Sequence, residues 1–300
     1  MEIRQLKYFI KTAETLNFSE TARSLYITQS TLSQQIKHLE EELGCQLFIR
    51  DSHSVTLTEY GERMLPLAKQ TLLDAESCKT QIRDLNNMAT GTLEIGATFS
   101  FSPVLRETVK NFIAEYPGIR LNITNRSMEE LMEMLRRREV DFVLAFKPNV
   151  PYEDIDSEIL FEDRLSVIMR KDHPLAQSNT LGIEEIRRHR LAIPAKGLQA
   201  RNMIDKYFDF MNSSFMVSLE VNSVYNLLEV VESSSLITIL SDATIKDRQK
   251  LTAIPLAVPD NQMQGCVHTL KKQYRKRSAE AFIRMLKESL ALIELSGKWA

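Results

Sequence analysis

The sequence predicts a multidomain α/β protein with an N-terminal helical module, one long helix and a C-terminal part in which strands alternate with helices. Three observations support this prediction. The chain has 300 residues, enough for two domains at ~150 residues each. Its 43% hydrophobic and 26% charged residues are ordinary for a globular protein. Its apolar residues recur with a helical period in the N-terminal third, and strand and helix periods alternate after that.

The N-terminal module is predicted to contain three short helices within residues 2–43, where apolar residues recur three and four positions apart. We expect the hydroxyl of Ser19 to cap the second helix and that of Thr28 to cap the third. Gly44 follows the third helix, and a left-handed conformation costs least at a glycine. Residues 47–58 then predict two short strands around a polar tip, which is a wing.

The third helix carries a polar face near its N-terminus, while Leu32, Ile36 and Leu39 face inward. Glutamine can pair with adenine, serine and threonine reach bases or phosphates, and lysine meets phosphate or guanine. Such side chains on a helix flanked by a short helix and a wing favour a DNA-reading face over the alternative, an ordinary solvated face. The predicted DNA-contacting residues of this helix are Thr28, Gln29, Ser30, Thr31, Ser33, Gln34 and Lys37.

A pattern of spaced residues covers the three helices and the wing. Its members are Phe9, Asn17, Phe18, Ser19, Ala22, Leu25, residues 28–37, Leu39, Glu40, Glu42, Leu43, Gly44, Leu47, Phe48, Arg50, Leu57, Thr58 and Gly61. This pattern resembles the winged helix-turn-helix of the LysR-type transcriptional regulators, and the resemblance implies that Arg50 and His53 contact DNA from the wing. His53 stands where a second basic residue is common, so we expect a weak, pH-dependent phosphate contact. Thr21 replaces a usual alanine at a packing position.

The charge of the module restricts how it can bind DNA. Residues 1–65 contain seven basic and nine acidic side chains, and the whole chain has a net charge of −2. Binding by bulk electrostatics is therefore excluded, and any DNA contact must be local. We expect modest affinity from one module and a higher affinity from an oligomer that binds two half-sites.

A long helix is predicted over residues 58–88, which contain one proline, Pro66, near the start and no glycine after Gly61. Its apolar residues are spaced close to a heptad repeat: Leu65, Ala68, Leu72, Ala75, Cys78, Ile82 and Leu85. We favour a helix that pairs with a second copy over the alternative, an amphipathic helix packed on its own domain. The resemblance implies the linker helix of a homodimer, and beyond it a dimer of dimers.

The C-terminal part is predicted to form parallel sheets with crossover helices, because strand and helix patterns alternate. The predicted strands are 92–97, 119–124, 140–146, 165–169, 190–194, 215–221, 236–240, 251–256 and 265–270, and the helices are 102–116, 127–138, 198–210, 223–233 and 278–295. Two α/β lobes joined by crossing strands follow from this order. They resemble the effector-binding domain of the same family, which is like a periplasmic solute-binding protein. The predicted domains are a winged helix-turn-helix DNA-binding domain (1–58), a linker and dimerisation helix (59–90) and an effector-binding domain of two α/β lobes (91–300).

A ligand site is expected between these lobes, because ligands of open α/β sheets bind at strand C-termini and helix N-termini. Hydroxyls, amides and cations at these positions suit a small organic anion, and Phe99 and Phe101 can add an aromatic wall. Simple helix capping is the alternative for each serine or threonine. The candidate effector-binding residues are Thr98, Ser100, Phe101, Ser102, Ser127, Lys147, Lys196, Gln199, Arg201, Asn222 and Ser223, with Arg126 beside Ser127.

Two turns of this part depart from the family pattern. Ser233, Ser234 and Ser235 stand where a Gly-x-Gly is usual, and Arg138 replaces a common glycine before Val140. Both changes concern turns rather than the fold, but they prevent the transfer of any particular effector from the family.

Other function classes lack their motifs. The glycine-rich nucleotide-binding motifs and the G-x-S-x-G motif are absent, the histidines and three cysteines lack metal-ligand spacing, and no apolar run approaches the ~20 residues of a membrane helix. We therefore predict a cytoplasmic, ligand-responsive and sequence-specific DNA-binding regulator, with no enzymatic activity, cofactor, metal or membrane association. Its expected partners are double-stranded DNA, a small-molecule effector, other copies of the chain and RNA polymerase. The alternative is a small-molecule-binding α/β protein with an N-terminal helical oligomerisation module.

Overall fold

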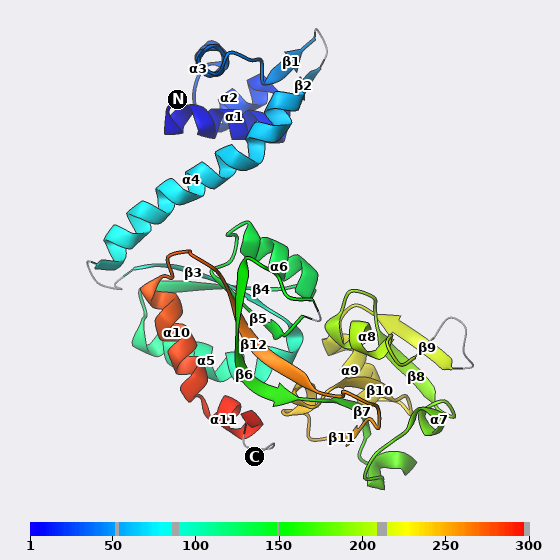
Figure 1. Ribbon diagram of the computed structural model, residues 1–300. Helices are drawn as coiled ribbons and strands as arrows, with labels where there is room; N and C mark the ends of the chain where they lie inside the picture. Colours follow the sequence, from blue (N-terminus) through cyan, green and yellow to red (C-terminus); the bar gives the residue numbers. More distant parts are fainter. Residues whose placement is uncertain (52–53, 86–89, 149, 209–214, 297–300) are drawn as a thin grey trace. The chain divides into compact units, whose positions relative to one another are not determined.

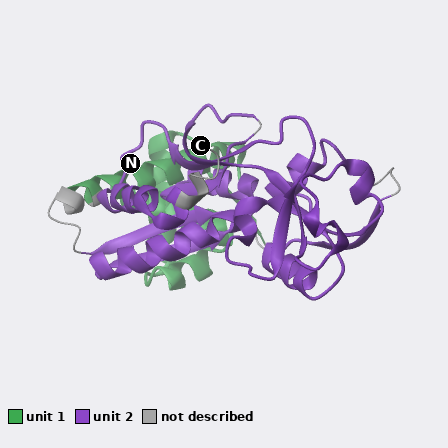
Figure 2. Ribbon diagram, turned by 90° about the horizontal axis from the view of Figure 1, so that it is seen from below, with its two compact units in different colours: residues 1–85 green, residues 86–300 purple. Residues whose placement is uncertain are grey.

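The computed structural model describes residues 1–51, 54–85, 90–148, 150–208 and 215–296 (Figure 1). His53, one of the predicted DNA contacts, lies outside the described residues. The chain divides into two compact units, Met1–Leu85 (unit 1) and Asn86–Ala300 (unit 2), which Figure 2 shows in different colours. The long helix therefore belongs to unit 1. No helix of the described ranges combines the length and the apolar character needed to cross a membrane.

Unit 1 is a winged helix-turn-helix followed by a long helix, as predicted (Figure 1). Its elements are α1 (Ile3–Thr15), α2 (Phe18–Ser24), α3 (Gln29–Leu43), β1 (Phe48–Arg50), β2 (Val55–Leu57) and α4 (Glu59–Leu85). β1 and β2 pair antiparallel and form the wing. The core contains Phe9, Phe18 and Phe48, and the rings of Phe9 and Phe18 each pack edge-on against Phe48 with centroids 5.6 Å apart.

The helix ends of unit 1 follow the capping rules, with one correction. Thr28 caps α3 as predicted, since its Oγ1 accepts a hydrogen bond from the backbone N–H of Thr31 at 3.1 Å. Gly44 ends α3 with φ +68°, a left-handed conformation. The prediction that Ser19 caps α2 is wrong. Asn17 is the cap, because helix α2 begins at Phe18 and the side chain of Asn17 accepts from the N–H of Glu20 at 3.0 Å.

The apolar stripe of α4 is divided into two parts. Leu65, Ala68 and Leu72 pack on the core of unit 1, and Ala68 is only 2% exposed. Ion pairs from Lys7 and Lys69 also join α1 and α4. Further along the helix Cys78 is exposed and Ile82 is 61% exposed. Packing on its own domain, the alternative to helix pairing, therefore describes the first half of the stripe, and only the second half is open.

The first lobe of unit 2 is a five-stranded sheet in the order β4-β3-β5-β12-β6. Its elements are β3 (Gly91–Ala97), η1 (Phe99–Phe101), α5 (Ser102–Glu115), β4 (Ile119–Asn125), α6 (Met128–Arg136), β5 (Phe142–Phe146), β6 (Ile155–Asp163), β12 (Met263–Leu270), α10 (Arg277–Glu288) and α11 (Leu290–Ser296). β3 runs parallel to β4 and β5, as predicted, but β12 is antiparallel to β5 and β6. Helix α6 packs on one face of the sheet, and α5 and α10 pack on the other.

The second lobe contains two small sheets, one of them antiparallel in the order β10-β7-β11 and one the parallel pair β8-β9. Its elements are β7 (Leu165–Arg170), η2 (Pro174–Gln177), α7 (Ile183–Ile186), β8 (Arg190–Pro194), α8 (Gln199–Ile204), β9 (Met216–Val221), α9 (Val224–Glu232), β10 (Thr238–Ser241), η3 (Asp242–Ile245) and β11 (Leu251–Pro255). The prediction of parallel sheets throughout is therefore wrong for β7, β10, β11 and β12, and β6 was not predicted at all.

The chain crosses between the lobes twice, and side chains hold both crossings. Asn261 accepts from the N–H of Leu165 at 2.8 Å and donates to the carbonyl oxygens of Leu165 and Leu256. The buried carboxylate of Asp163 accepts from the N–H groups of Arg164 and Ala243. Burial raises the pKa of Asp163 to about 6, against these backbone hydrogen bonds that lower it.

Turns and helix ends account for the remaining differences in unit 2. Helix α8 ends at Ile204, earlier than predicted, and Ser289 interrupts the predicted final helix between α10 and α11. Arg138 has φ +57°, which explains why a glycine is common at this turn. Arginine in place of glycine makes this turn conformation less favourable, but strand β5 still forms after it.

Candidate functional site

The outer face of α3 presents the residues predicted to contact DNA. Leu32, Ile36 and Leu39 are fully buried beneath it. Gln29, Ser30, Thr31, Gln34 and Lys37 are exposed, and Ser33 is partly exposed. The hydroxyl of Thr28 is engaged, because it caps α3 and hydrogen-bonds to the hydroxyls of Ser30 and Thr31. Thr28 therefore orders the first turn of the helix.

The wing places Arg50 beside this face. Its guanidinium forms an ion pair with Glu40 at 3.3 Å and lies 4.3 Å from the ring centroid of Phe18. Glu40 also accepts from the N–H groups of Leu47 and Phe48, so one carboxylate ties α3 to β1. Arg50, Ser33, Gln34 and Lys37 line a common surface groove. The structure thus brings the predicted wing cation next to the predicted helix residues.

Ser19 lies at the same surface, in a role that the sequence analysis missed. Its hydroxyl donates to Oε1 of Gln29 at 2.9 Å. This hydrogen bond turns the Nε2 side of the Gln29 amide away from α2. The sequence pattern does not predict this contact, because it depends on how α2 crosses α3.

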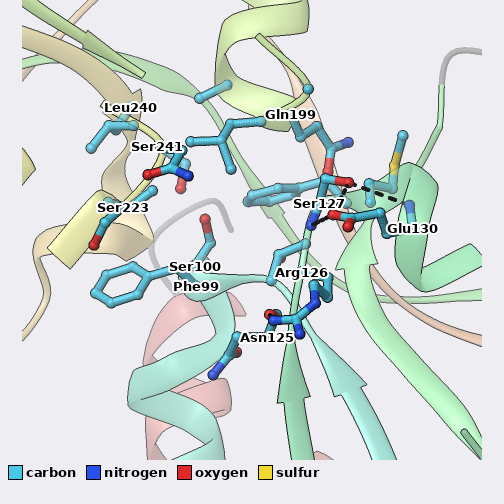
Figure 3. Close-up of a pocket in the computed structure, with 18 of the residues that line it drawn as sticks. Phe99, Ser100, Asn125, Arg126, Ser127, Glu130, Gln199, Ser223, Leu240 and Ser241 are labelled. Atoms are coloured by element: carbon cyan, nitrogen blue, oxygen red, sulfur yellow. Dashed lines mark hydrogen bonds between the residues drawn. The ribbon is translucent and has the colours of Figure 1, made fainter. Parts of the chain in front are cut away.

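The second candidate site is a cavity of about 610 Å³ between the two lobes of unit 2 (Figure 3). The loops after β3 and β4 contribute from the first lobe, and the loops before α8 and α9 contribute from the second. These are the strand ends and helix starts at which ligands of α/β sheets bind. The predicted effector residues that line the cavity are Thr98, Ser100, Ser127, Lys196, Gln199, Asn222 and Ser223, and Arg126 and Phe99 line it as well.

Two of the hydroxyls in the cavity are helix caps. Ser127 Oγ accepts from the N–H of Glu130 at the start of α6, and Ser223 Oγ accepts from the N–H of Asn226 at the start of α9. Capping, the alternative considered for such residues, is correct for both. Their positions still bring two helix N-termini, with their partial positive charge, to the wall of the cavity.

Glu130 is a cavity residue that the sequence analysis missed, although Ser-x-x-Glu is a capping-box signal. Its Oε2 accepts from the N–H of Ser127 at 3.0 Å and from the hydroxyl of Ser127 at 2.7 Å (Figure 3). The hydroxyl and N–H of Ser127, followed by nearby Arg126, lower the pKa of Glu130. The wall of the cavity therefore includes the carboxylate of Glu130 and the cations Arg126 and Lys196.

Gln199 joins the two lobes at the cavity. Its Nε2 donates to the backbone carbonyl of Lys147 at 3.3 Å. This orients the opposite side of the amide, Oε1, which is buried and has no hydrogen-bond partner among the described residues. One helical turn further on, Asn202 donates to Glu129 of the first lobe at 2.8 Å.

Four predicted effector residues do not line this cavity. Phe101 is fully buried and packs against Phe146 and Phe161 in the core. Ser102 begins α5, outside the cavity. Lys147 faces a separate, smaller cavity and donates to Gln264.

Arg201 is the fourth of these residues, and it is a structural cation. Its side chain is 3% exposed, forms ion pairs with Asp205 at 2.6 Å and Glu220 at 3.3 Å, and donates to the carbonyl of Pro194. A buried charge needs such partners, and they hold α8 against β8 and β9.

Two further observations concern metal ligands and thiols in the part of the chain that the structure describes. No three His, Cys, Asp or Glu side chains there converge as metal ligands. Cys266 is buried, and burial raises the pKa of its thiol to about 11, which favours the protonated form at neutral pH.

A winged helix-turn-helix joined to a two-lobed unit with an interlobe cavity defines the class of DNA-binding regulators that carry an effector-binding domain. Two family profiles match the chain. One, described as a bacterial regulatory helix-turn-helix protein of the lysR family, matches residues 3–62, and the other, the LysR substrate binding domain, matches residues 86–291. The chain belongs to the LysR family of transcriptional regulators.

Relatives and solved structures agree with this assignment. The transcriptional dual regulator GltC of Bacillus subtilis is 28% identical over 282 residues, which is 94% of each chain. The activator IlvY of Haemophilus influenzae is 36% identical over 163 residues, or 54% of each chain.

The solved structures show the same fold. A full-length OxyR variant from Pseudomonas aeruginosa has a TM-score of 0.71 and 22% identity, covering 97% of this chain and 96% of that one. Full-length CbnR in complex with its target DNA has a TM-score of 0.64 and 18% identity, covering 96% and 99%. The CcmR regulatory domain of Synechocystis PCC6803, solved in complex with 2-PG, has a TM-score of 0.58 and 22% identity, covering 66% and 97%.

Proposed function

We propose that a small organic anion, bound in the interlobe cavity of unit 2, controls the DNA binding of this regulator. The observation that carries the proposal is the set of charges in the cavity. Arg126 and Lys196 face it from opposite lobes, and the N-terminus of α9 adds partial positive charge. An anion that contacts both lobes favours the conformation in which they are close, and so shifts the population of the whole domain.

On the DNA side, we propose that Gln29, Ser30, Thr31, Ser33, Gln34 and Lys37 contact the major groove and that Arg50 contacts a phosphate. The exposure of the α3 face and its shared groove with Arg50 support this assignment. CbnR, whose fold this chain shares, was solved with its target DNA. The match of residues 3–62 to a DNA-binding family disfavours the alternative, an oligomerisation module without DNA binding.

We propose further that the regulator acts as a homodimer or a dimer of dimers, through the exposed part of α4, and that RNA polymerase is a partner. The exposed Ile82 supports self-association. The relatives are named as transcriptional regulators, which supports a function without catalysis.

A thermal-shift experiment on the full-length protein tests the anion site. We expect small carboxylates and organic phosphates that fit the cavity to raise the unfolding temperature of the wild type. The Arg126→Gln variant should lose most of the shift, because it lacks one of the two cavity cations. Arg137→Gln is the matched control, since Arg137 lies at the end of α6 and pairs with Glu133. Equal shifts in wild type and Arg126→Gln, or no shift with any anion, would contradict the proposal.

A further inference from the structure

We propose that the cavity ligand carries a protonated amine as well as a carboxylate, which makes it an amino acid. This inference rests on the proposed anion site and names the class of ligand that the same cavity takes. It starts from two hydrogen-bond acceptors in the cavity wall, Glu130 and Gln199, which a simple anion leaves unused or opposes.

The carboxylate of Glu130 is the first acceptor. Oε2 takes both hydrogen bonds from Ser127, and among the described residues no donor bonds to Oε1. A ligand carboxylate at the N-terminus of α6 would meet this negative charge directly, because the capping box holds Glu130 there. An ammonium group at the same place gains a charge-assisted hydrogen bond instead.

The amide oxygen of Gln199 is the second acceptor. The hydrogen bond from Nε2 to the carbonyl of Lys147 fixes which end of the amide is the acceptor and which is the donor. Oε1 is then left buried without a partner among the described residues. A buried, unsatisfied acceptor is unfavourable, and a ligand N–H group would satisfy it.

The two acceptors belong to helices that meet across the cleft. Asn202 of α8 donates to Glu129 of α6 at 2.8 Å, which links the helix of Gln199 to the helix of Glu130. In Figure 3, Gln199 lies on the same side of the view as Ser127 and Glu130. Ser223 and Ser241 lie on the opposite side. Both acceptors thus lie at one end of the cavity, where Figure 3 also shows Arg126.

The two cations of the cavity wall are placed to bind the carboxylate of such a ligand. Arg126 and Lys196 supply two positive charges against the one negative charge of Glu130. The ligand that complements such a wall has an ammonium group for the acceptors and at least one carboxylate for the cations. A cavity of about 610 Å³ has room for an amino acid of any size.

The test compares L-amino acids with the 2-oxo acids of the same carbon skeleton, by calorimetric titration into the full-length protein. Each pair keeps the carboxylate and exchanges the ammonium for a carbonyl. We expect at least one amino acid to bind about tenfold or more tightly than its 2-oxo acid, the difference that one charge-assisted hydrogen bond supplies.

Glu130→Gln is the decisive variant, because glutamine also completes a capping box and so preserves the start of α6. It should weaken the binding of that amino acid by about tenfold and leave its 2-oxo acid unchanged or more tightly bound. Glu133→Gln is the control, since Glu133 lies on the same helix but pairs with Arg136 and Arg137.

Two results would overturn the inference. If 2-oxo acids bind and amino acids bind no better, or if Glu130→Gln leaves their ratio unchanged, the ligand is a simple anion and the proposed function stands alone. If no compound of either series binds, both the inference and the anion site fail.

Discussion

His268 shows how a single buried residue makes the stability of unit 2 depend on pH. The ring is fully buried, with Nε2 at 3.2 Å from the carbonyl of Ala145 and Nδ1 at 2.8 Å from the hydroxyl of Ser157. The carbonyl only accepts, so Nε2 carries the proton and Nδ1 accepts from Ser157. Burial lowers the pKa of His268 to about 4, although hydrogen bonds to backbone carbonyls oppose this shift.

The direction in which stability changes with pH follows from the difference in proton binding between the folded and unfolded chain. Below pH 6.5 the unfolded chain takes up a proton at this residue and the folded chain does not, so stability falls as the pH falls toward 4. The slope reaches ~1.4 kcal/mol per pH unit. We expect the stability advantage of wild type over His268→Gln to be largest near pH 7 and to shrink below pH 6.5.

Urea unfolding of the full-length protein at several pH values measures this advantage. Wild type must be compared with His268→Gln because Asp163 also makes stability depend on pH. Burial raises the pKa of Asp163 to about 6, so its contribution to the slope of stability against pH has the opposite sign between pH 4 and 6. The same substitution at exposed His38 is the control. A difference between wild type and His268→Gln that does not change with pH would contradict the buried neutral ring.

Residue-level predictions from the sequence succeeded where the contact is local. Thr28 caps α3 because a hydroxyl and an amide three residues apart need only the helix itself. Arg201 was proposed for the ligand, but besides the local ion pair with Asp205 it pairs with Glu220 on another strand, and only the folded lobe shows that this cation is buried. The same applies to Ser19, whose partner Gln29 is on the next helix.

At the scale of elements, the apolar stripe of α4 has a packed part and an exposed part. Its first half belongs to the core of unit 1, and its second half exposes Ile82. We expect Ile82→Glu to weaken self-association about 100-fold, because two isoleucines would each lose ~1.5 kcal/mol of burial. Analytical ultracentrifugation of the full-length protein measures the change.

Ser77→Glu is the matched control, since residue 77 lies about 140° around the helix from residue 82. It adds the same charge on a different face and should leave association unchanged. Equal association of wild type and Ile82→Glu would show that copies of the chain meet elsewhere.

The sequence analysis missed strand β6 because the strand lacks a recognisable pattern of apolar residues. It is an edge strand of its sheet, and most of its residues between Ile155 and Phe161 are exposed and polar. Neither alternation nor an apolar run marks such a strand. The direction of β12 was also beyond the sequence, because the pattern of a strand contains no information about its partner.

At the scale of the whole molecule, two units divide the function between them. Unit 1 presents a polar helix face on a small apolar core, and unit 2 surrounds a charged cavity with two lobes. The resemblance of unit 1 to its family was visible in a pattern of spaced residues between Phe9 and Gly61, and the profile match over residues 3–62 confirms it. The cavity was predictable only in outline, because the orientation of Gln199 depends on how the lobes meet, although the capping box that holds Glu130 is local.

The central claim is that this regulator reads DNA through the outer face of α3. The most direct test selects binding sequences from a random DNA pool with the wild type and measures their affinity for a Gln29→Ala/Ser33→Ala double variant by fluorescence anisotropy. A Ser77→Ala/Gln81→Ala variant, with the same residue types changed on α4, is the control. We predict that the α3 variant loses about 100-fold in specific affinity, at ~1–3 kcal/mol for each lost base contact, while the control binds as wild type. Undiminished binding by the α3 variant would contradict the claim.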